Sequence, residues 1–216
     1  MRIWLRTLLS RFKRSEDGVA AVEFALITPF LLALYFGSME ASVLFMADKR
    51  INSVSATLGD LVSQWDPTDG KIPTAALTTY FAAGPNILSP NDITSPDILS
   101  PFKTNALKQV VSLIFVKTDG TTKVLWSKTS GTGAVARTVG KPYAPLDTSS
   151  TTDVIARGGC LVVAESSYTY RPLFGQVFTT TFNLAHTNYF IPRFGATGVI
   201  NLEDTSLSTT ACTSGS

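Results

Sequence analysis

The sequence predicts an α+β protein: one long N-terminal helix, whose first half crosses a membrane, packed on the antiparallel sheet of a head at 66–216. Two observations lead to this fold class. An apolar run at 19–39 continues into a helical stripe that ends near Trp65. Runs rich in β-branched and aromatic residues then gather between residues 110 and 202. A helix followed by clustered strands is typical of the α+β class.

Residues 1–18 are expected to form a basic leader. Positive residues beside a membrane span stay in the cytoplasm, so the head is expected in the periplasm. The rest of the chain has a net charge of −1, so the mild overall basicity does not indicate nucleic-acid binding. The leader's net charge of +3 comes from five basic and two acidic residues: Arg2, Arg6, Arg11, Lys13 and Arg14 against Glu16 and Asp17.

Residues 19–40 are expected to form a transmembrane helix. Glu23 is the only charge at 19–39, and these residues rise roughly 30 Å, the thickness of the hydrocarbon layer. Three interpretations of the N-terminus are open. A cleaved secretory signal needs a small-x-small site, which residues 37–41 match poorly. An uncut signal anchor explains the length but not a carboxylate that costs roughly 2.5–3.5 kcal/mol in a membrane.

The third interpretation, a class III signal, follows from a resemblance. Gly18, with Glu23 and Phe24 at the fifth and sixth positions after it, resembles a prepilin-peptidase processing site. Residues 20–32 are similar to TadE/TadG-like minor pseudopilins of the tight-adherence (Tad/Flp) type IVb pilus system. The resemblance implies cleavage after Gly18. It also implies four partners: prepilin peptidase, other minor pseudopilins, the Flp pilin and the inner-membrane assembly platform.

The residues of this site also suggest its chemistry. Gly18 lets an extended backbone enter a protease cleft closely. Cleavage would give Val19 a terminal ammonium that pairs with Glu23 of its own or a neighbouring subunit. Alternatively, Glu23 reaches the membrane interface from one turn inside the helix. Pro29 removes one helical hydrogen bond, and the neighbouring Thr28 can bond to the freed carbonyl.

A stripe of apolar residues predicts that the same helix continues through 41–65. Asp66-Pro67 should end it, because a residue before proline is pushed out of the helical region. Coiled-coil pairing and packing on the chain's own head both fit the pattern, and the length of about three heptads favours the head. The outline resembles a pilin stalk. The stripe, spaced by three and four residues, is Leu44, Ala47, Ile51, Val54, Leu58, Leu61 and Trp65.

The remaining elements of the head are predicted from turn residues and strand-forming runs. The clearest is a hairpin of 110–117 and 121–127, turned at Thr118-Asp119-Gly120. The others, in chain order, are a linker at 66–73, a helix at 74–83 closed by Gly84-Pro85, a loop at 90–101, a loop at 131–150, an element starting at 153–155, and strands at 160–170, 178–190 and 199–202.

Two late segments, 165–175 and 191–194, resemble TadE/TadG-like proteins more loosely. Their arginines, Arg171 and Arg193, are candidates for binding carboxylates or a partner's acidic surface, although capping a strand end is the commoner role. Four aromatic residues suit a sheet face and are expected to pack in the core: Tyr168, Tyr170, Tyr189 and Phe190.

Little in the head points to chemistry. Cys160 and Cys212 are the only cysteines, and in an oxidising compartment we expect one disulfide, the alternative being two thiols. The chain has a single histidine, His186, and no Cys or His pair has zinc spacing. We therefore expect neither a metal nor a cofactor. The carboxylates are scattered and no serine lies in a nucleophile elbow, so we expect no enzyme.

These features favour a TadE/TadG-like minor pseudopilin with a single span in the bacterial inner membrane, where it contacts the lipid bilayer. It would take part in assembling or anchoring a Tad/Flp pilus. A signal-anchored periplasmic sensor or binding module is the first alternative, and it predicts an intact Met1 and tolerance of Glu23→Ala. A membrane-tethered hydrolase and a type II secretion pseudopilin are the others.

Overall fold

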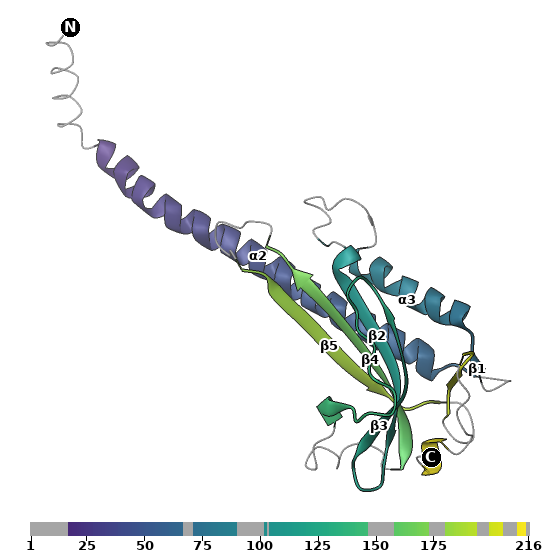
Figure 1. Ribbon diagram of the computed structural model, residues 1–216. Helices are drawn as coiled ribbons and strands as arrows, with labels where there is room; N and C mark the ends of the chain where they lie inside the picture. The colour runs from purple at the N-terminus through teal and green to yellow at the C-terminus, as the bar shows by residue number, and fades with distance from the viewer. Residues whose placement is uncertain are drawn as a thin grey trace, which may run out of the picture.

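The fold comes from a computed structural model of the chain (Figure 1). Four predicted features lie wholly or largely outside the described residues: the leader, the loop at 90–101, the end of the 131–150 loop, and the element at 153–155. The structure describes residues 17–66, 71–89, 102, 104–146, 158–172, 180–193, 199–204 and 211–214.

One helix, α2 (Asp17–Ser63), runs for 47 residues and continues through Pro29. Its first half projects away from the head and its second half lies along the sheet (Figure 1). The helix ends two residues before Trp65, the predicted last residue. The Trp65 backbone N–H donates to the Val62 carbonyl, and its indole donates to the Lys71 carbonyl at 3.0 Å. These bonds tighten the chain and turn it back toward the head.

Four antiparallel strands form the sheet: β2 (Leu107–Val116), β3 (Thr122–Ser130), β4 (Gly159–Tyr170) and β5 (Phe182–Phe190). Their order is β3-β2-β4-β5. The predicted hairpin is confirmed, with both strands longer than expected. Asp119 accepts bonds from the backbone and hydroxyl of Thr121, and Gly120 adopts a φ of 89°. The predicted strands at 160–170 and within 178–190 are also confirmed.

The second long helix, α3 (Thr74–Leu88), corrects the prediction that Gly84-Pro85 ends it. Proline at position 85 leaves the carbonyl of Phe81 without its helical donor. The side-chain amide of Gln109 on β2 donates to this carbonyl at 3.0 Å, so the helix continues. A Cβ at Gly84 would overlap the Gln109 side chain, so glycine is what allows the amide to reach the helix.

Two short strands pair in parallel, β1 (Lys71–Ile72) and β6 (Asn201–Leu202). The final strand is therefore confirmed at its end, whereas the linker predicted at 66–73 contains a strand. Burial gives the reason, because Ile72 and Leu202 are both inside the core. A short helix, α4 (Ala211–Ser214), follows.

The head has its main core between the helices and one face of the sheet. Even-numbered residues of β4, such as Ala164 and Tyr168, lie on this face with α2 and α3. The opposite face carries a smaller cluster in which Tyr143 and Leu146, from the predicted 131–150 loop, cover Leu161 and other strand residues. The predicted α+β class, with a long N-terminal helix on an antiparallel sheet, is confirmed.

Candidate functional site

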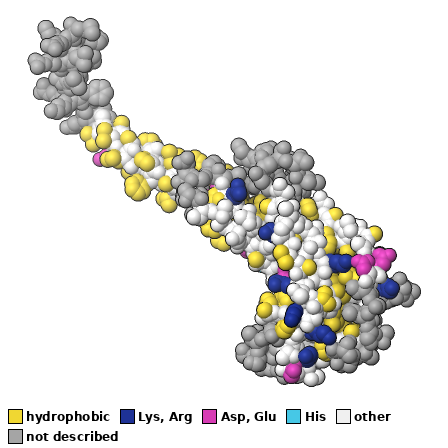
Figure 2. Space-filling view, in the orientation of Figure 1, with side chains coloured by type: hydrophobic (Ala, Val, Ile, Leu, Met, Phe, Trp, Pro, Cys, Tyr) yellow, Lys and Arg dark blue, Asp and Glu magenta, His cyan; other side chains and the backbone are white. Residues whose placement is uncertain are grey.

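The first half of α2, residues 18–39, exposes apolar side chains all round the helix, and Figure 2 shows those on the face in view. Leu26, Phe30 and Leu34 are 68%, 75% and 71% exposed. A helix that is apolar all round belongs in a membrane or a large core, and here no core surrounds it. Its 22 residues rise about 33 Å, enough to cross a bilayer. Within the described residues, α2 is the one helix long and apolar enough to do so.

Gly18 and Glu23 lie at the start of this exposed half. Gly18 is in helical conformation, and apart from its chain neighbours and the adjoining helix backbone no described atom lies within 4 Å of the position a Cβ would take. Glu23 is exposed and has no hydrogen-bond or ion-pair partner among the residues that the structure describes. The exposed Val19 and Phe24 flank the pair. A lone carboxylate on an apolar rod needs a partner if the rod enters lipid.

Pro29 lies within α2 and is exposed. The expectation that Thr28 would bond to the carbonyl freed by Pro29 is wrong. That carbonyl belongs to Ala25, whereas the Thr28 hydroxyl donates at 2.7 Å to Phe24, one residue earlier. A threonine hydroxyl in a helix commonly donates to the carbonyl of the residue four positions earlier, and for Thr28 that residue is Phe24.

The second half of α2 packs its apolar stripe against the chain's own head. Ala47, Ile51, Val54 and Leu58 are buried in the main core. Leu44 and Trp65 are partly buried at its two ends. Leu61 departs from the prediction, since it is half-buried while Val62 enters the core. An α-helix has 3.6 residues per turn, so a repeat of 3.5 drifts by about 20° per heptad and the core position passes to the next residue.

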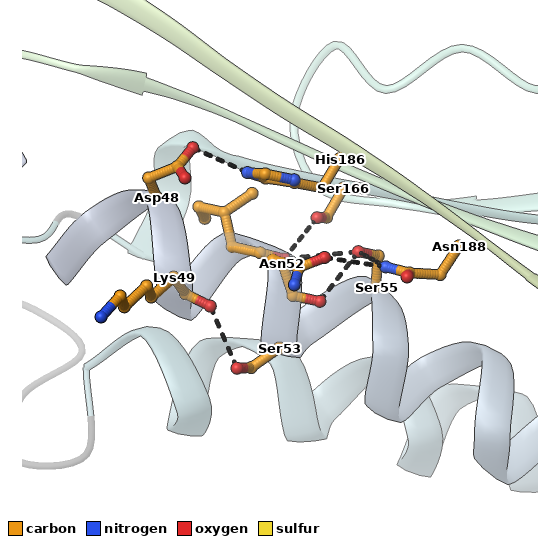
Figure 3. A network of polar contacts seen from close by, with 9 residues as sticks. Asp48, Lys49, Asn52, Ser53, Ser55, Ser166, His186 and Asn188 are labelled. Atoms are coloured by element: carbon orange, nitrogen blue, oxygen red, sulfur yellow. Dashed lines mark hydrogen bonds and ion pairs between the residues drawn. The ribbon is translucent and has the colours of Figure 1, made fainter. Parts of the chain in front are cut away.

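Polar side chains reinforce this packing (Figure 3). His186 of β5 lies 2.7 Å from the Asp48 carboxylate. The Ser166 hydroxyl of β4 donates to the Ile51 carbonyl at 2.7 Å, and Asn188 donates to Ser55 at 2.8 Å. Each bond joins the helix to a strand more than 110 residues away in sequence. This network could not be predicted from the sequence, because no local pattern pairs residues so far apart.

Glu40 marks the boundary between the two halves of α2. It is only 2% exposed, and the buried hydroxyl of Tyr170, the last residue of β4, donates to its carboxylate. Burial, with Glu40 beside it, raises the pKa of the Tyr170 hydroxyl above its ordinary value. The hydroxyl therefore stays protonated as a donor. Glu40 could have been found from the sequence, since it lies four residues before Leu44 and continues the stripe backwards.

The structure contains the expected disulfide between Cys160 and Cys212. It joins the start of β4 to α4 across a sequence separation of 52 residues. By loop-closure entropy such a link stabilises the folded state by about 4 kcal/mol. Both cysteines are buried in the main core, so the bond also holds α4 onto the sheet.

The two candidate arginines have different surroundings. Arg193 lies 2.6 Å from the Asp60 carboxylate of α2, so its predicted carboxylate partner is within the chain. Arg171 is exposed and has no partner among the described residues. Tyr168 and Tyr170 are buried and Phe190 lies partly buried on Gly59, as expected for core aromatics. Tyr189 corrects the prediction, because it points to the opposite face of the sheet and is 41% exposed.

Comparison with known proteins gives one match. Residues 18–57 match the family model described as TadE-like protein. The match begins at the glycine of the predicted processing site and covers both the exposed half of α2 and much of its packed half. The head lies outside it, including the two late segments whose resemblance was looser. No curated protein and no solved structure matches the chain.

Proposed function

We propose, from the match of residues 18–57 to the TadE-like family model, that this chain is a minor pseudopilin that helps to assemble or anchor a Tad/Flp pilus. In this proposal prepilin peptidase cleaves after Gly18. The exposed half of α2 then stays in the inner membrane, and the head lies in the periplasm. The partners are other minor pseudopilins, the Flp pilin and the inner-membrane assembly platform.

One observation carries the proposal: the exposed half of α2 begins at Gly18 and presents a single carboxylate, Glu23, which has no partner among the described residues, on an otherwise apolar surface. Cleavage would create the Val19 ammonium near this carboxylate. A buried ammonium and a buried carboxylate are each costly alone and tolerable as a pair. Pairing between neighbouring subunits would set the register of their helices. A plain membrane anchor has no use for Glu23.

We propose a structural rather than a catalytic role for the head. Its main core fixes α2 to the sheet, so a force or contact at the membrane helix is transmitted to the head. The packed half of α2 supports this, because apolar and polar contacts both hold it in one orientation. The role follows from orientation and assembly, with no bond made or broken by the mature chain.

Glu23→Ala, made in the organism that produces the protein, tests the proposal, with Ile27→Ala as the matched control. Ile27 is also exposed on the first half of α2 but is uncharged. We expect Glu23→Ala to leave the protein in the membrane while abolishing cross-links to other pilins and reducing surface pili. Ile27→Ala should retain both. Unchanged cross-links and pili in Glu23→Ala would contradict the proposal and favour the signal-anchored sensor.

A further inference from the structure

The membrane-facing end of the head can be located from contacts along α2. Strand β4 runs toward the projecting half of the helix (Figure 1). Ser166 bonds to Ile51, and Tyr170, four strand residues later, bonds to Glu40, eleven helical residues earlier. Four strand steps cover about 13 Å and eleven helical steps about 16 Å, so strand and helix run side by side. The end of β4 is therefore level with Glu40.

Arg171 follows directly and extends past this level. One more residue in the same direction advances about 3 Å, which corresponds to about two helical residues. Arg171 is then roughly level with Ser38, inside the last turn of the apolar run at 18–39. Strand β5 begins at the same level, since Phe182 pairs with Tyr170. Among the described residues, the sheet thus ends at the level where the apolar run ends.

The surroundings of Arg171 leave its charge available. Its side chain is exposed and, among the residues that the structure describes, has no hydrogen-bond or ion-pair partner. The carboxylate at this level, Glu40, is buried and accepts the Tyr170 hydroxyl. Arg193, farther up the sheet, is already paired with Asp60. An exposed guanidinium held at the surface of a bilayer faces the phosphates of the lipid headgroups.

We propose that Arg171 is a binding site for the phosphate of an anionic phospholipid in the leaflet below the head. The planar guanidinium matches a phosphate with two parallel hydrogen bonds, which a lysine does not reproduce. Basic side chains near an anionic bilayer surface are attracted to it. The Glu40–Tyr170 bond holds the strand end at this height. The head is then fixed to the membrane at two points, the helix and Arg171, and this sets its tilt.

The inference rests on the membrane insertion in the proposed function, so the test separates the two. Full-length wild type, Arg171→Gln and the control Arg193→Gln are first floated with vesicles of phosphatidylglycerol and phosphatidylcholine. Each protein is then placed in nanodiscs that contain equal amounts of phosphatidylglycerol and phosphatidylcholine. Native mass spectrometry of the protein released from the discs measures the ratio of retained phosphatidylglycerol to retained phosphatidylcholine.

We expect all three proteins to float with the vesicles. Wild type and Arg193→Gln should retain phosphatidylglycerol preferentially, and Arg171→Gln should lower the retained ratio about fivefold. Arg171→Lys should recover part of it, because the charge returns without the planar geometry. Equal ratios for Arg171→Gln and wild type, with all proteins floating, would overturn the lipid site alone. Failure of every protein to float would overturn both the site and the membrane anchoring beneath it.

Discussion

Residues 18–39 and 40–63 belong to one helix, yet they have opposite surroundings. The first half exposes large apolar side chains in every direction and carries one carboxylate without a described partner. The second half buries one apolar face, and its polar groups bond to strands of the head. Helix formation alone therefore does not distinguish them. The difference lies in the surface that each half presents: one is apolar and exposed, and the other has an apolar face buried against the chain's own sheet.

The change occurs within one turn, at Glu40. Both Glu23 and Glu40 are carboxylates on the same helix, but Glu40 is buried with a hydroxyl donor, whereas Glu23 is exposed and has no donor among the described residues. A buried carboxylate is stable only where donors surround it. Glu40 therefore fixes where the head begins, and Glu23 is left for a partner outside the described chain. Paired substitutions in the two halves test this division.

The largest difference in the free energy of unfolding is expected between Ile51→Ala and Ile27→Ala. Ile51 is fully buried in the core, so truncating it should lower the free energy of unfolding of the head by about 2–5 kcal/mol. Ile27 is 54% exposed in the other half, and its truncation should change that free energy by less than about 0.5 kcal/mol. Urea unfolding of the full chain in micelles, followed by tryptophan fluorescence, measures both. Equal losses would contradict the division.

A smaller loss is expected for Tyr170→Phe. The substitution removes the donor to the buried Glu40 carboxylate and should cost about 1–3 kcal/mol of unfolding free energy. The same urea experiment measures it, and Thr169→Val, which removes an exposed strand hydroxyl bonded to Asn183, is the control. If Tyr170→Phe unfolds at the same urea concentration as wild type, the bond from Tyr170 does not stabilise the buried Glu40 carboxylate.

The cost of Tyr170→Phe should also depend on pH. Burial, with Glu40 beside it, raises the pKa of the Tyr170 hydroxyl in the folded protein above the unfolded value near 10. The stability this proton contributes is fully present below about pH 10 and is lost as the pH rises through the folded pKa. The difference in unfolding free energy between wild type and Tyr170→Phe should therefore become smaller above about pH 10. A constant difference between pH 8 and 11 would exclude this coupling.

The smallest difference in the free energy of unfolding is expected between Gly59→Ala and Gly18→Ala. A Cβ at Gly59 would overlap the ring of Phe190, and such overpacking costs about 1–3 kcal/mol. Alanine's better helix propensity offsets up to about 1 kcal/mol of this. Gly18→Ala has no neighbouring atom to displace and should leave the head as stable as wild type. Urea unfolding compares the two, and a Gly59→Ala protein as stable as Gly18→Ala would show that Phe190 moves without cost.

Local pattern predicted the elements of the fold well. The apolar run, the helical stripe and the Thr118-Asp119-Gly120 turn each depend on neighbours in sequence, and the helix and hairpin form where expected. The disulfide could also be predicted, because only two cysteines are present. The predicted stripe is wrong at one position, Leu61, which is only half-buried because a heptad pattern drifts from the true helical repeat.

The remaining features of the fold could not be predicted, because they depend on contacts between residues that are distant in sequence. α3 continues past Pro85, and Gln109, 24 positions later, bonds to the freed Phe81 carbonyl. The bonds of His186 and Asn188 to α2 likewise join residues over 130 positions apart. The β1–β6 ladder is two residues long and leaves almost no local signal. Such pairings are decided by the packed structure rather than by any short segment.

The most direct test of the account is the N-terminal sequence and intact mass of the protein purified from its own membranes, with Gly18→Ala beside wild type. Because Gly18→Ala is expected to leave the head as stable as wild type, a difference between the two proteins would report processing. The account predicts a chain that begins at Val19 in wild type and at Met1 in the variant. A chain that begins at Met1 in both would contradict it and leave a signal-anchored protein. A start near Ala41 would indicate ordinary secretion of the head.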